Sequence, residues 1–417
     1  SELSTGLSDL EKDLIDALLK RYSPDTTADI SELNLDYMNA MTEVKEKSPQ
    51  HPDVLTFYAA SVMNTTPWNY WSKEGNPMPN IKEAKEALEK AIELNPEHPG
   101  AHHYYIHMVE LPKPDEAVPS AEKLAHLMPG AGHMVHMPGH IFMRVGRYDE
   151  AVKANQDAIL VDENYISQCY AQGIYPLGYY PHNIHFLWSA ASMMANEELA
   201  IDAAKKTAEK VPYSGLEGNY YYQRFASTPI LAYLRFGKWN DILSYPDPGS
   251  EYRYLSMIRT YARGIAFLRK DNLKEAREEL EFLSASLKEN DSSEVTQVAR
   301  AVVSGEIQAY QKNYSAAIKD LVRAVQLEDE LPYDEPSRWY IPTRQSLGSV
   351  LLKAGKYAEA EKTFREDLEY YRSNIWSLTG LVQSLEAQGK HQEAEQFKLD
   401  LERARKHSDI VVEEPVF

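Results

Sequence analysis

The apolar residues of this chain recur at the spacing of amphipathic helices. Ala84, Leu88 and Ala91 lie at positions i, i+4 and i+7, which places them on one face of a helix. Pro96 is expected to end that helix, because the residue before a proline is disfavoured in the helical conformation. Runs that alternate strictly between apolar and polar residues are nearly absent. The pattern therefore predicts helices rather than strands.

This helical pattern is repeated along the chain. A small residue recurs five places after a turn residue. The turn residues are at positions 79, 112, 146, 195, 237, 271, 312, 355 and 389. The residue five places later is alanine in every case but one, which is Ile242 after position 237. The spacing is near 34 residues or is stretched to between 41 and 49 residues, and such a period is typical of helix pairs that stack into a solenoid. In this respect the chain resembles the tetratricopeptide-repeat (TPR) family. We therefore expect an all-α fold, a TPR-like right-handed superhelical solenoid of antiparallel helix pairs.

The repeats divide the chain into three predicted segments. Residues 1–78 are expected to hold N-terminal helical repeats and a tryptophan-rich loop. Residues 79–211 are expected to hold the histidine-rich TPR-like repeats that carry the candidate site, and residues 212–417 the C-terminal repeats.

Helix starts, turns and loops are also predicted. Ser8 and Glu11 form a capping-box pattern before the first apolar helix positions. Glycines are expected to supply the positive φ of the turn inside several helix pairs, at positions 146, 237, 355 and 389. Function in a solenoid tends to be carried by long ordered loops, which are expected here at 66–80, 171–183 and 329–342.

Histidines are concentrated in one part of the chain. Ten of the 13 lie between His98 and His185. His103, His107 and Glu110 are spaced i, i+4 and i+7, which places them on one face of a helix. Further clusters follow at His133, His136 and His140, and at His182 and His185.

The repeat register relates these clusters to one another. Adding 34 or 49 residues to position 102 gives His136 and His185, and 49 residues separate His133 from His182. Helix axes about 8–10 Å apart allow imidazoles at one register to converge. Imidazole is a common ligand of zinc, copper and iron, and Glu110 would serve as a further ligand or as a general base. We predict a transition-metal site on the concave face, with zinc, copper and iron not distinguished, formed by His103, His107, Glu110, His136, His140, His182 and His185.

Other interpretations of the histidines stay open. Instead of binding a metal, the histidines would form a hydrogen-bonded network that lines a ligand groove, or their clustering would be accidental. Seven candidate ligands exceed the four of a tetrahedral centre, so either two ions bind or some members orient the rest. Pro138 interrupts the helix between His136 and His140 and weakens the expectation that these two rings face each other.

Aromatic side chains in the loops are candidates for the wall of a small-molecule pocket. Trp68 and Trp71 lie in the first long loop, and Tyr179 and Tyr180 lie beside the third histidine cluster. Most other tyrosines are expected to pack between repeats. Arg144 is a candidate for holding a carboxylate or phosphate, with a salt bridge to a nearby acid as the alternative.

Composition and motifs argue against several classes of function. The net charge of −19 argues against a nucleic-acid partner, and no apolar run approaches the length of a membrane span. Cys169 is the single cysteine, so an internal disulfide framework and a cysteine zinc site are excluded. No phosphate-binding glycine loop, GxSxG or HExxH motif is present. We expect a soluble protein that is cytoplasmic, or exported with a signal removed before Ser1.

Several long strings resemble an uncharacterised family of TPR proteins with a histidine-rich central segment. They include PWNYW (67–71), HPGAHHYYIHMVE (98–110), QGIYPLGYYPHNIHFL (172–187) and LEDELPYDEPSRWYIPTRQSLG (327–348). The resemblance implies further helical repeats before the point that matches Ser1. It also implies a set of recurrent polar positions, which are His103, His107, Glu110, His136, His140, His182, Asn183 and His185.

The resemblance and the repeat register differ at one position. The register favours His102, whereas the resemblance favours His103. We take His103, because it shares a helix face with His107 and Glu110. The later loop carries a further group that the resemblance implies to cap the groove, consisting of Glu335, Trp339, Tyr340 and Arg344.

Two hypotheses about function follow. The first is a metal-binding solenoid that binds a small ligand, with metal-activated water or dioxygen chemistry as its catalytic form. The second is a non-catalytic TPR adaptor that binds a peptide or protein partner in its groove. Peptide-binding grooves of this kind usually present Lys, Arg and Asn, whereas this one would present imidazoles and tyrosines. That difference favours the first hypothesis.

Overall fold

The computed structural model describes residues 6–169, 172–287 and 293–417. Ser1, the first residue of the predicted N-terminal segment, and Ala171, the first residue of the predicted loop at 171–183, lie outside the described residues. The described residues form α-helices joined by turns and by longer loops, including those at 66–80 and 330–342, and contain no strand; their isolated bridge pairs Trp71 with Pro77. The all-α fold is therefore confirmed, and the handedness of a superhelix stays a prediction. The loop predicted at 171–183 is wrong for most of its described residues, which are helical from Tyr175 onward.

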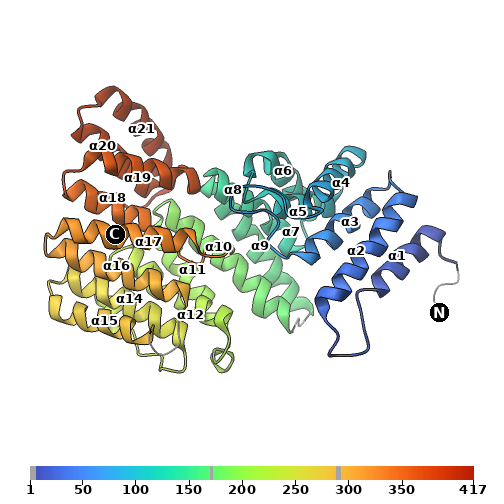
Figure 1. The fold of residues 1–417 in the computed structure, drawn as a ribbon, viewed down its shortest axis with the longest axis horizontal. Coiled ribbons are helices and arrows are strands. Elements are labelled where there is room, and N and C mark those ends of the chain that lie inside the picture. Colours follow the sequence, from blue (N-terminus) through green and yellow to red (C-terminus); the bar gives the residue numbers. More distant parts are fainter. Residues whose placement is uncertain (1–5, 170–171, 288–292) are drawn as a thin grey trace. The chain divides into compact units, whose positions relative to one another are not determined.

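The chain consists of two compact units (Figure 1), Ser1–Ile141 (unit 1) and Phe142–Phe417 (unit 2). The division into three segments made from the repeats stays a prediction. The helices of unit 1 are α1 (Asp9–Leu19), α2 (Ile30–Lys47), α3 (Pro52–Thr65), α4 (Ile81–Leu94), α5 (Pro99–Val109), the 3-10 helix η2 (Pro114–Ala117), α6 (Val118–Leu127), α7 (Gly132–His136) and the first part of α8 (Pro138–Val145).

Unit 2 contains the rest of α8 and the remaining helices, and within it successive helices again pack as neighbours. Its helices are α9 (Tyr148–Cys169), the π-helix η3 (Tyr175–Tyr179), α10 (Tyr180–Met193), α11 (Glu197–Glu209), η4 (Tyr213–Gly215), α12 (Tyr220–Arg235), α13 (Trp239–Ser244), α14 (Arg253–Arg269), α15 (Leu273–Ser286), α16 (Glu294–Tyr310), α17 (Tyr314–Asp329), α18 (Thr343–Lys353), α19 (Tyr357–Tyr370), α20 (Ile375–Ala387), α21 (His391–Ala404) and η5 (Arg405–His407).

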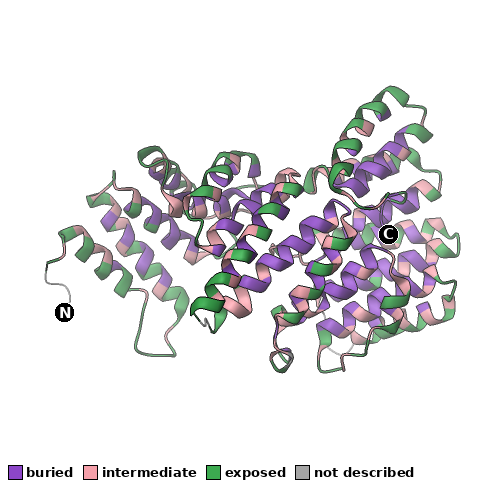
Figure 2. Ribbon diagram, turned by 180° about the vertical axis from the view of Figure 1, so that it is seen from behind, coloured by how far each residue is buried: buried purple, intermediate pink, exposed green. Residues whose placement is uncertain are grey.

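The residues at the repeated position five places after each turn belong to the core. All nine side chains at this register are fully buried, and Figure 2 shows buried residues along the faces where paired helices meet. Alanine at this register allows the two helices of a pair to approach closely. The nine residues are Ala84, Ala117, Ala151, Ala200, Ile242, Ala276, Ala317, Ala360 and Ala394.

The predicted turn positions have an unusual backbone. The four predicted glycines, at 146, 237, 355 and 389, adopt positive φ, as expected. Ala195, Asp271 and Lys312 occupy the same position in other pairs and also have positive φ. The turn geometry is therefore common to these pairs whether or not the residue is glycine. At the other end of the chain, the Ser8–Glu11 capping box is present at the start of α1.

The last ten residues of the chain pack back onto unit 2. Val412 and Val416 are buried. The Asp409 carboxylate accepts hydrogen bonds from the backbone N–H groups of Glu197 and Glu198, at 2.6 and 2.9 Å, and so covers the N-terminus of α11. Arg235 of α12 donates from Nη1 to the carbonyl oxygen of Val416 at 3.1 Å. This segment joins helices that are far apart in the sequence.

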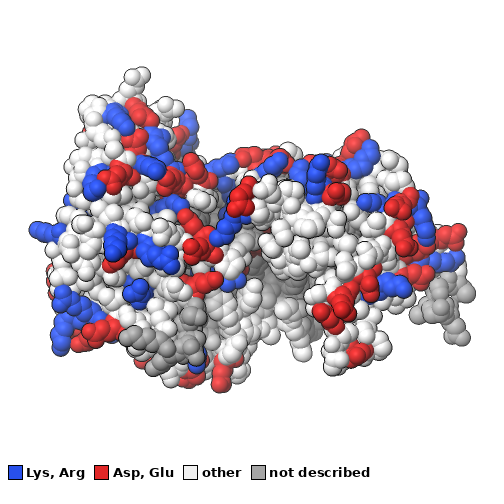
Figure 3. All heavy atoms as spheres, in the orientation of Figure 1, with Lys and Arg blue, Asp and Glu red and all other residues white. Residues whose placement is uncertain are grey.

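Acidic and basic side chains are interspersed on the face shown in Figure 3. Among the described residues, no helix combines the length and the apolarity that crossing a membrane requires.

Candidate metal centre

Two short helices of unit 1 carry most of the histidines. Proline at the first position of α5 is compatible with a helix start, and the His98 ring accepts a hydrogen bond from the backbone N–H of Ala101 at 3.0 Å. Glu110 is the C-cap residue that directly follows α5. The helix that begins at Gly132 stops after His136, and a new one begins at Pro138, as expected for a proline.

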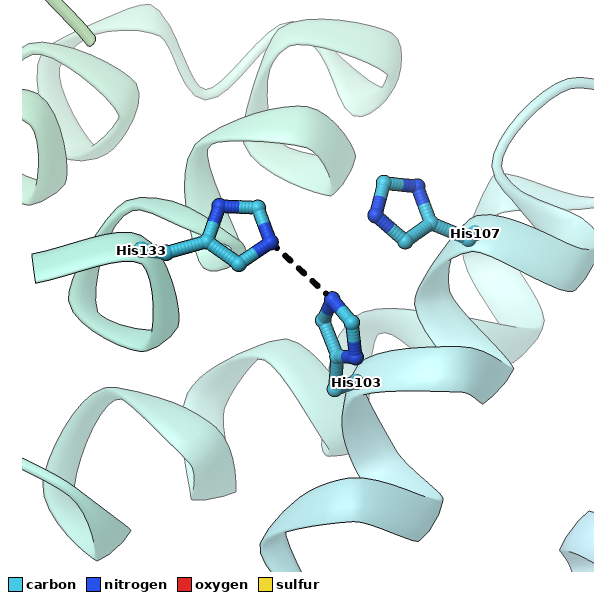
Figure 4. A group of neighbouring side chains, drawn as sticks. All are labelled: His103, His107 and His133. Atoms are coloured by element: carbon cyan, nitrogen blue, oxygen red, sulfur yellow. Dashed lines mark hydrogen bonds between the residues drawn. The ribbon is translucent and has the colours of Figure 1, made fainter. Parts of the chain in front are cut away.

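Three imidazoles from α5 and α7 come together (Figure 4). One nitrogen from each of His103, His107 and His133 lies within 4.8 Å of the others. The Nε2 atoms of His103 and His133 are 3.1 Å apart. The ring centroid of His107 is 5.0 Å from that of His103 and 6.4 Å from that of His133. All three side chains are partly exposed, so the site is accessible from solvent.

Behind them lies a buried acidic network. Both oxygens of Glu110 are used: Oε1 is 3.1 Å from Nδ1 of His107, and Oε2 is 2.8 Å from Nδ1 of His140. The Nε2 atoms of His136 and His140 are 2.9 Å apart, although Pro138 lies between these residues. Glu110, His136 and His140 are each at most 2% exposed.

The environment favours neutral imidazoles at His103 and His133 and an ionised carboxylate at Glu110. Burial lowers the pKa of His133 to about 3. Burial, together with the neighbouring imidazoles of His107 and His133, lowers the pKa of His103 well below its usual value. Burial by itself would raise the pKa of Glu110, but pairing with His140 and hydrogen bonds from His107 and His140 lower it well below its usual range. Neutral imidazole is the form that binds metals.

The geometry is compatible with a metal ion. Two nitrogens bound to one tetrahedral ion at about 2.0–2.1 Å are about 3.3 Å apart, and the Nε2 atoms of His103 and His133 are already 3.1 Å apart. An ionised Glu110 fixes Nδ1–H as the donor of His107, so Nε2 of that ring is the nitrogen that would coordinate. A carboxylate behind a ligating imidazole is the usual arrangement in metal sites.

The tryptophan-rich loop is attached to the same helix. Trp71 donates from Nε1 to the carbonyl oxygen of Met108 at 2.7 Å, one residue after His107. Trp68 is 56% exposed and has a positive φ of 57°. Trp71 therefore holds the loop against the end of α5, whereas the Trp68 ring faces solvent.

Two predicted metal ligands belong to unit 2. His182 of α10 is partly buried, and its ring centroid is 4.9 Å from that of Phe186. His185 is buried among aromatic rings, stacked on Trp188 at 5.4 Å and in edge contact with Tyr340 at 5.3 Å. Within unit 2 these two histidines do not form a cluster of the kind seen in unit 1.

Two of the predicted ligand-binding residues of unit 2 donate hydrogen bonds to acidic side chains of α9. Asn183 donates to the buried carboxylate of Asp162 at 2.7 Å, and Tyr180 donates to Glu163 at 2.7 Å. Tyr179 is 42% exposed, in the π-helix that precedes α10. The Arg144 guanidinium lies over the ring of Tyr333, 5.3 Å from its centroid.

The predicted ligand set did not contain His133. The signal was present in the sequence, because His133 lies one turn before His136. His102, which the register favoured, is buried and engaged by Ser120 Oγ and the carbonyl oxygen of Pro96, each at 3.0 Å. His103, the residue preferred over it, lies in the cluster.

Comparisons with known proteins address the fold. The tetratricopeptide-repeat family model matches residues 79–98, which include α4. No curated protein matches the chain in sequence.

Several solved structures are similar over most of the chain. The APC/C hetero-tetramer Cut9–Hcn1 is 12% identical, with 98% of this chain and 81% of that chain covered and a TM-score of 0.40. Yeast Tom70 is 12% identical, with 96% and 92% covered and a TM-score of 0.40. A human IFIT1 dimer with PPP-AAAA is 14% identical, with 90% and 79% covered and a TM-score of 0.38. Likenesses at these TM-scores carry no argument about function.

The repeat match and the helix pairs with their buried register residue agree with each other. The chain thus carries a match to the tetratricopeptide-repeat model at residues 79–98 within an all-α fold of packed helix pairs.

Proposed function

We propose that this TPR protein binds a transition-metal ion in unit 1, with His103, His107 and His133 as its ligands. The proposal rests on one observation, the convergence of nitrogens from these three rings within 4.8 Å. Three imidazole ligands suit zinc, copper and iron. Three protein ligands also leave an open position, which is the arrangement of catalytic zinc sites.

The buried part of the cluster supports this assignment. Glu110 contacts His107 and His140 through hydrogen bonds that use both its oxygens. This favours a role for Glu110 in orienting ligands over direct coordination. His136 and His140 would then not be ligands of the ion. A metal with an open position would polarise a water or a small ligand, and partial exposure of the three rings leaves access for it.

The first test is metal content. Protein purified without chelators and dialysed against metal-free buffer should retain close to one equivalent of zinc, copper or iron by elemental analysis. The His133→Gln variant should lose most of this metal, because two imidazoles remain. Helical content by circular dichroism should be unchanged, since glutamine is a polar side chain of similar size at a partly exposed position.

His126 provides the matched control. It lies in the last turn of α6 in the same unit and outside the cluster, so His126→Gln should retain the metal. Equal metal content in wild type and His133→Gln, or no bound metal after loading with each of the three ions, would exclude the proposed site.

A second candidate function is the adaptor that the fold also fits. Helix-pair repeats commonly present surfaces for protein partners. The first pair of unit 1 exposes large apolar side chains, including Leu18, Leu19, Ile30 and Leu35, as binding surfaces often do. If this is the function, a partner captured with wild-type protein should be lost on Leu19→Glu, and His133→Gln should retain it.

A further inference from the structure

A small cavity lies in unit 2, away from the histidine cluster in sequence. The centre of a water-sized group can move within about 10 Å³ there, so the cavity has room for one small occupant. The residues that line it are Trp188, Ser189, Ser192, Leu231, Arg235, Tyr340 and Ile341.

The arginine that lines this cavity is buried without a direct ion pair. Arg235 is 3% exposed, and its guanidinium stacks on Trp376 at 3.7 Å. Nη1 donates to Gln345 Oε1 at 2.7 Å and to the carbonyl oxygen of Val416 at 3.1 Å. Nη2 is buried and has no hydrogen-bond partner among the described residues. A buried cation with an unused donor is costly unless something compensates it.

The nearest acidic group does not fill this role directly. Asp367 is buried and is linked to the arginine through Gln345, whose Nε2 donates to Asp367 Oδ2 at 3.2 Å. Oδ2 also accepts from Ser377 and from Asn374. Burial raises the pKa of Asp367. The Arg235 guanidinium reaches this carboxyl group through Gln345 and forms no direct ion pair with it.

The other lining groups are suited to a negatively charged or accepting occupant. Trp188 Nε1 is a pure donor, buried and without a partner in the described part of the chain. The hydroxyl of Ser192 donates to the carbonyl oxygen of Trp188 at 2.8 Å, and Trp376 Nε1 donates to the carbonyl oxygen of Ser192 at 2.9 Å. These bonds hold the wall in place. No carboxylate lines the cavity.

We propose that this cavity binds a compact monoanion of the size of chloride, held by Nη2 of Arg235 and Nε1–H of Trp188. The small volume excludes larger carboxylates and phosphates. An anion here would compensate the charge of Arg235, which also holds the returning C-terminal segment through Val416. The residues that line the cavity are different from those of the proposed metal centre.

Bromide provides the direct test, because it replaces chloride and scatters anomalously. Crystals of the full chain grown in sodium bromide should show an anomalous peak in contact with Arg235 Nη2. A cavity that is empty or holds only a water under these conditions would overturn the proposal.

A solution measurement complements the crystal. Replacing gluconate by chloride at constant ionic strength should raise the melting temperature in a saturable way, because a ligand that binds only the folded state stabilises it. Equal melting curves in both salts would also overturn the proposal.

Variants separate binding from general salt effects. Arg235→Gln should abolish the chloride-dependent rise, but it also removes bonds to Gln345 and Val416 and lowers stability by itself. Trp188→Phe keeps an aromatic side chain, although a smaller one, and removes the Nε1–H donor. The chloride concentration that gives half of the rise in melting temperature should therefore increase several-fold. Trp239→Phe lies outside the cavity and should behave as wild type. A chloride response that survives in Arg235→Gln would contradict the assignment.

Discussion

Individual side chains decide which nitrogen each histidine presents. In unit 1 a single carboxylate, Glu110, engages Nδ1 of two imidazoles, His107 and His140. Both Nε2 atoms are thereby left for other contacts, and Nε2 of His140 faces that of His136. The proposed ligand His107 thus depends on a residue that is not expected to touch the ion.

Glu110→Gln tests this dependence. The glutamine has the same shape but only one accepting oxygen, so one imidazole loses its partner. We expect affinity for the metal to fall by about 10–100-fold, as is typical for loss of a residue that orients a ligand, measured by competition with a coloured chelator. Glu97→Gln is the control, because Glu97 lies on the surface of the same unit, paired with Lys123. Unchanged affinity in Glu110→Gln would show that Glu110 does not position the site.

Gly146 combines two constraints at one residue. Its φ is +78°, and a Cβ placed on it would lie 2.5 Å from the carbonyl oxygen of Arg372. Gly355 has a similar φ of +71° with no atom within 4 Å of such a Cβ. We expect Gly355→Ala to cost about 1 kcal/mol from the backbone alone, and Gly146→Ala to cost more in urea denaturation. If the two variants lose the same free energy of unfolding, the backbone near Arg372 moves to accommodate the added Cβ at no cost.

The face formed by His103, His107 and Glu110 was predictable from its spacing alone, because residues at i, i+4 and i+7 share a helix face. The position of His133 was less certain. It belongs to a helix of five residues that ends before Pro138, and the direction of so short an element is decided by packing. That is why the sequence indicated the cluster but not its full membership.

Helix ends show how packing overrides local preference. Ala195, Asp271 and Lys312 adopt a positive φ that disfavours side chains with a Cβ. They occupy the turn position at which other pairs have glycine. The residue five places after each of these turns is buried. We infer that packing of the two helices, and not the preference of the turn residue, determines the backbone conformation of the turn.

An interaction distant in sequence stabilises the start of α11. Asp409 accepts hydrogen bonds from two backbone N–H groups there and places a negative charge at the positive end of the helix dipole. We expect Asp409→Ala to lower the free energy of unfolding by about 1 kcal/mol.

Asp400→Ala is the matched control for this effect. Asp400 pairs with Arg403 on the surface of α21, and exposed pairs contribute little. Urea denaturation should therefore leave Asp400→Ala close to wild type. If Asp409→Ala and Asp400→Ala lose the same free energy of unfolding, the hydrogen bonds from Asp409 to the start of α11 do not stabilise the fold.

For the whole molecule, stability should depend on pH through a carboxyl group in unit 2. Glu328 accepts hydrogen bonds from the backbone N–H and the hydroxyl of Thr343, at 2.8 and 2.6 Å. Burial nevertheless raises the pKa of Glu328 to about 7. Between its unfolded pKa, near 4.3, and 7 the folded state binds more protons than the unfolded state, so this group lowers stability as pH rises through that window.

Glu328→Gln removes this titration and keeps an acceptor for Thr343. Between about pH 5 and pH 8 the wild type should lose stability relative to the variant, and the difference should level off above pH 7. Urea denaturation at several pH values measures it, with Glu330→Gln as the exposed control. Parallel pH profiles for wild type and Glu328→Gln would contradict the shifted pKa.

The sequence by itself determined the all-α repeat fold, the buried register residue, most of the turn positions and the grouping of histidines. These follow from periodicity, because a helix places residues three, four and seven apart on one face regardless of the rest of the chain. Only the tertiary structure decided which histidines meet, since His103 and His133 come from different helices and His185 is packed among aromatic rings. It also decided the cavity at Arg235 and the return of the C-terminal segment. Such features depend on contacts between residues far apart in the chain, and no local pattern encodes them.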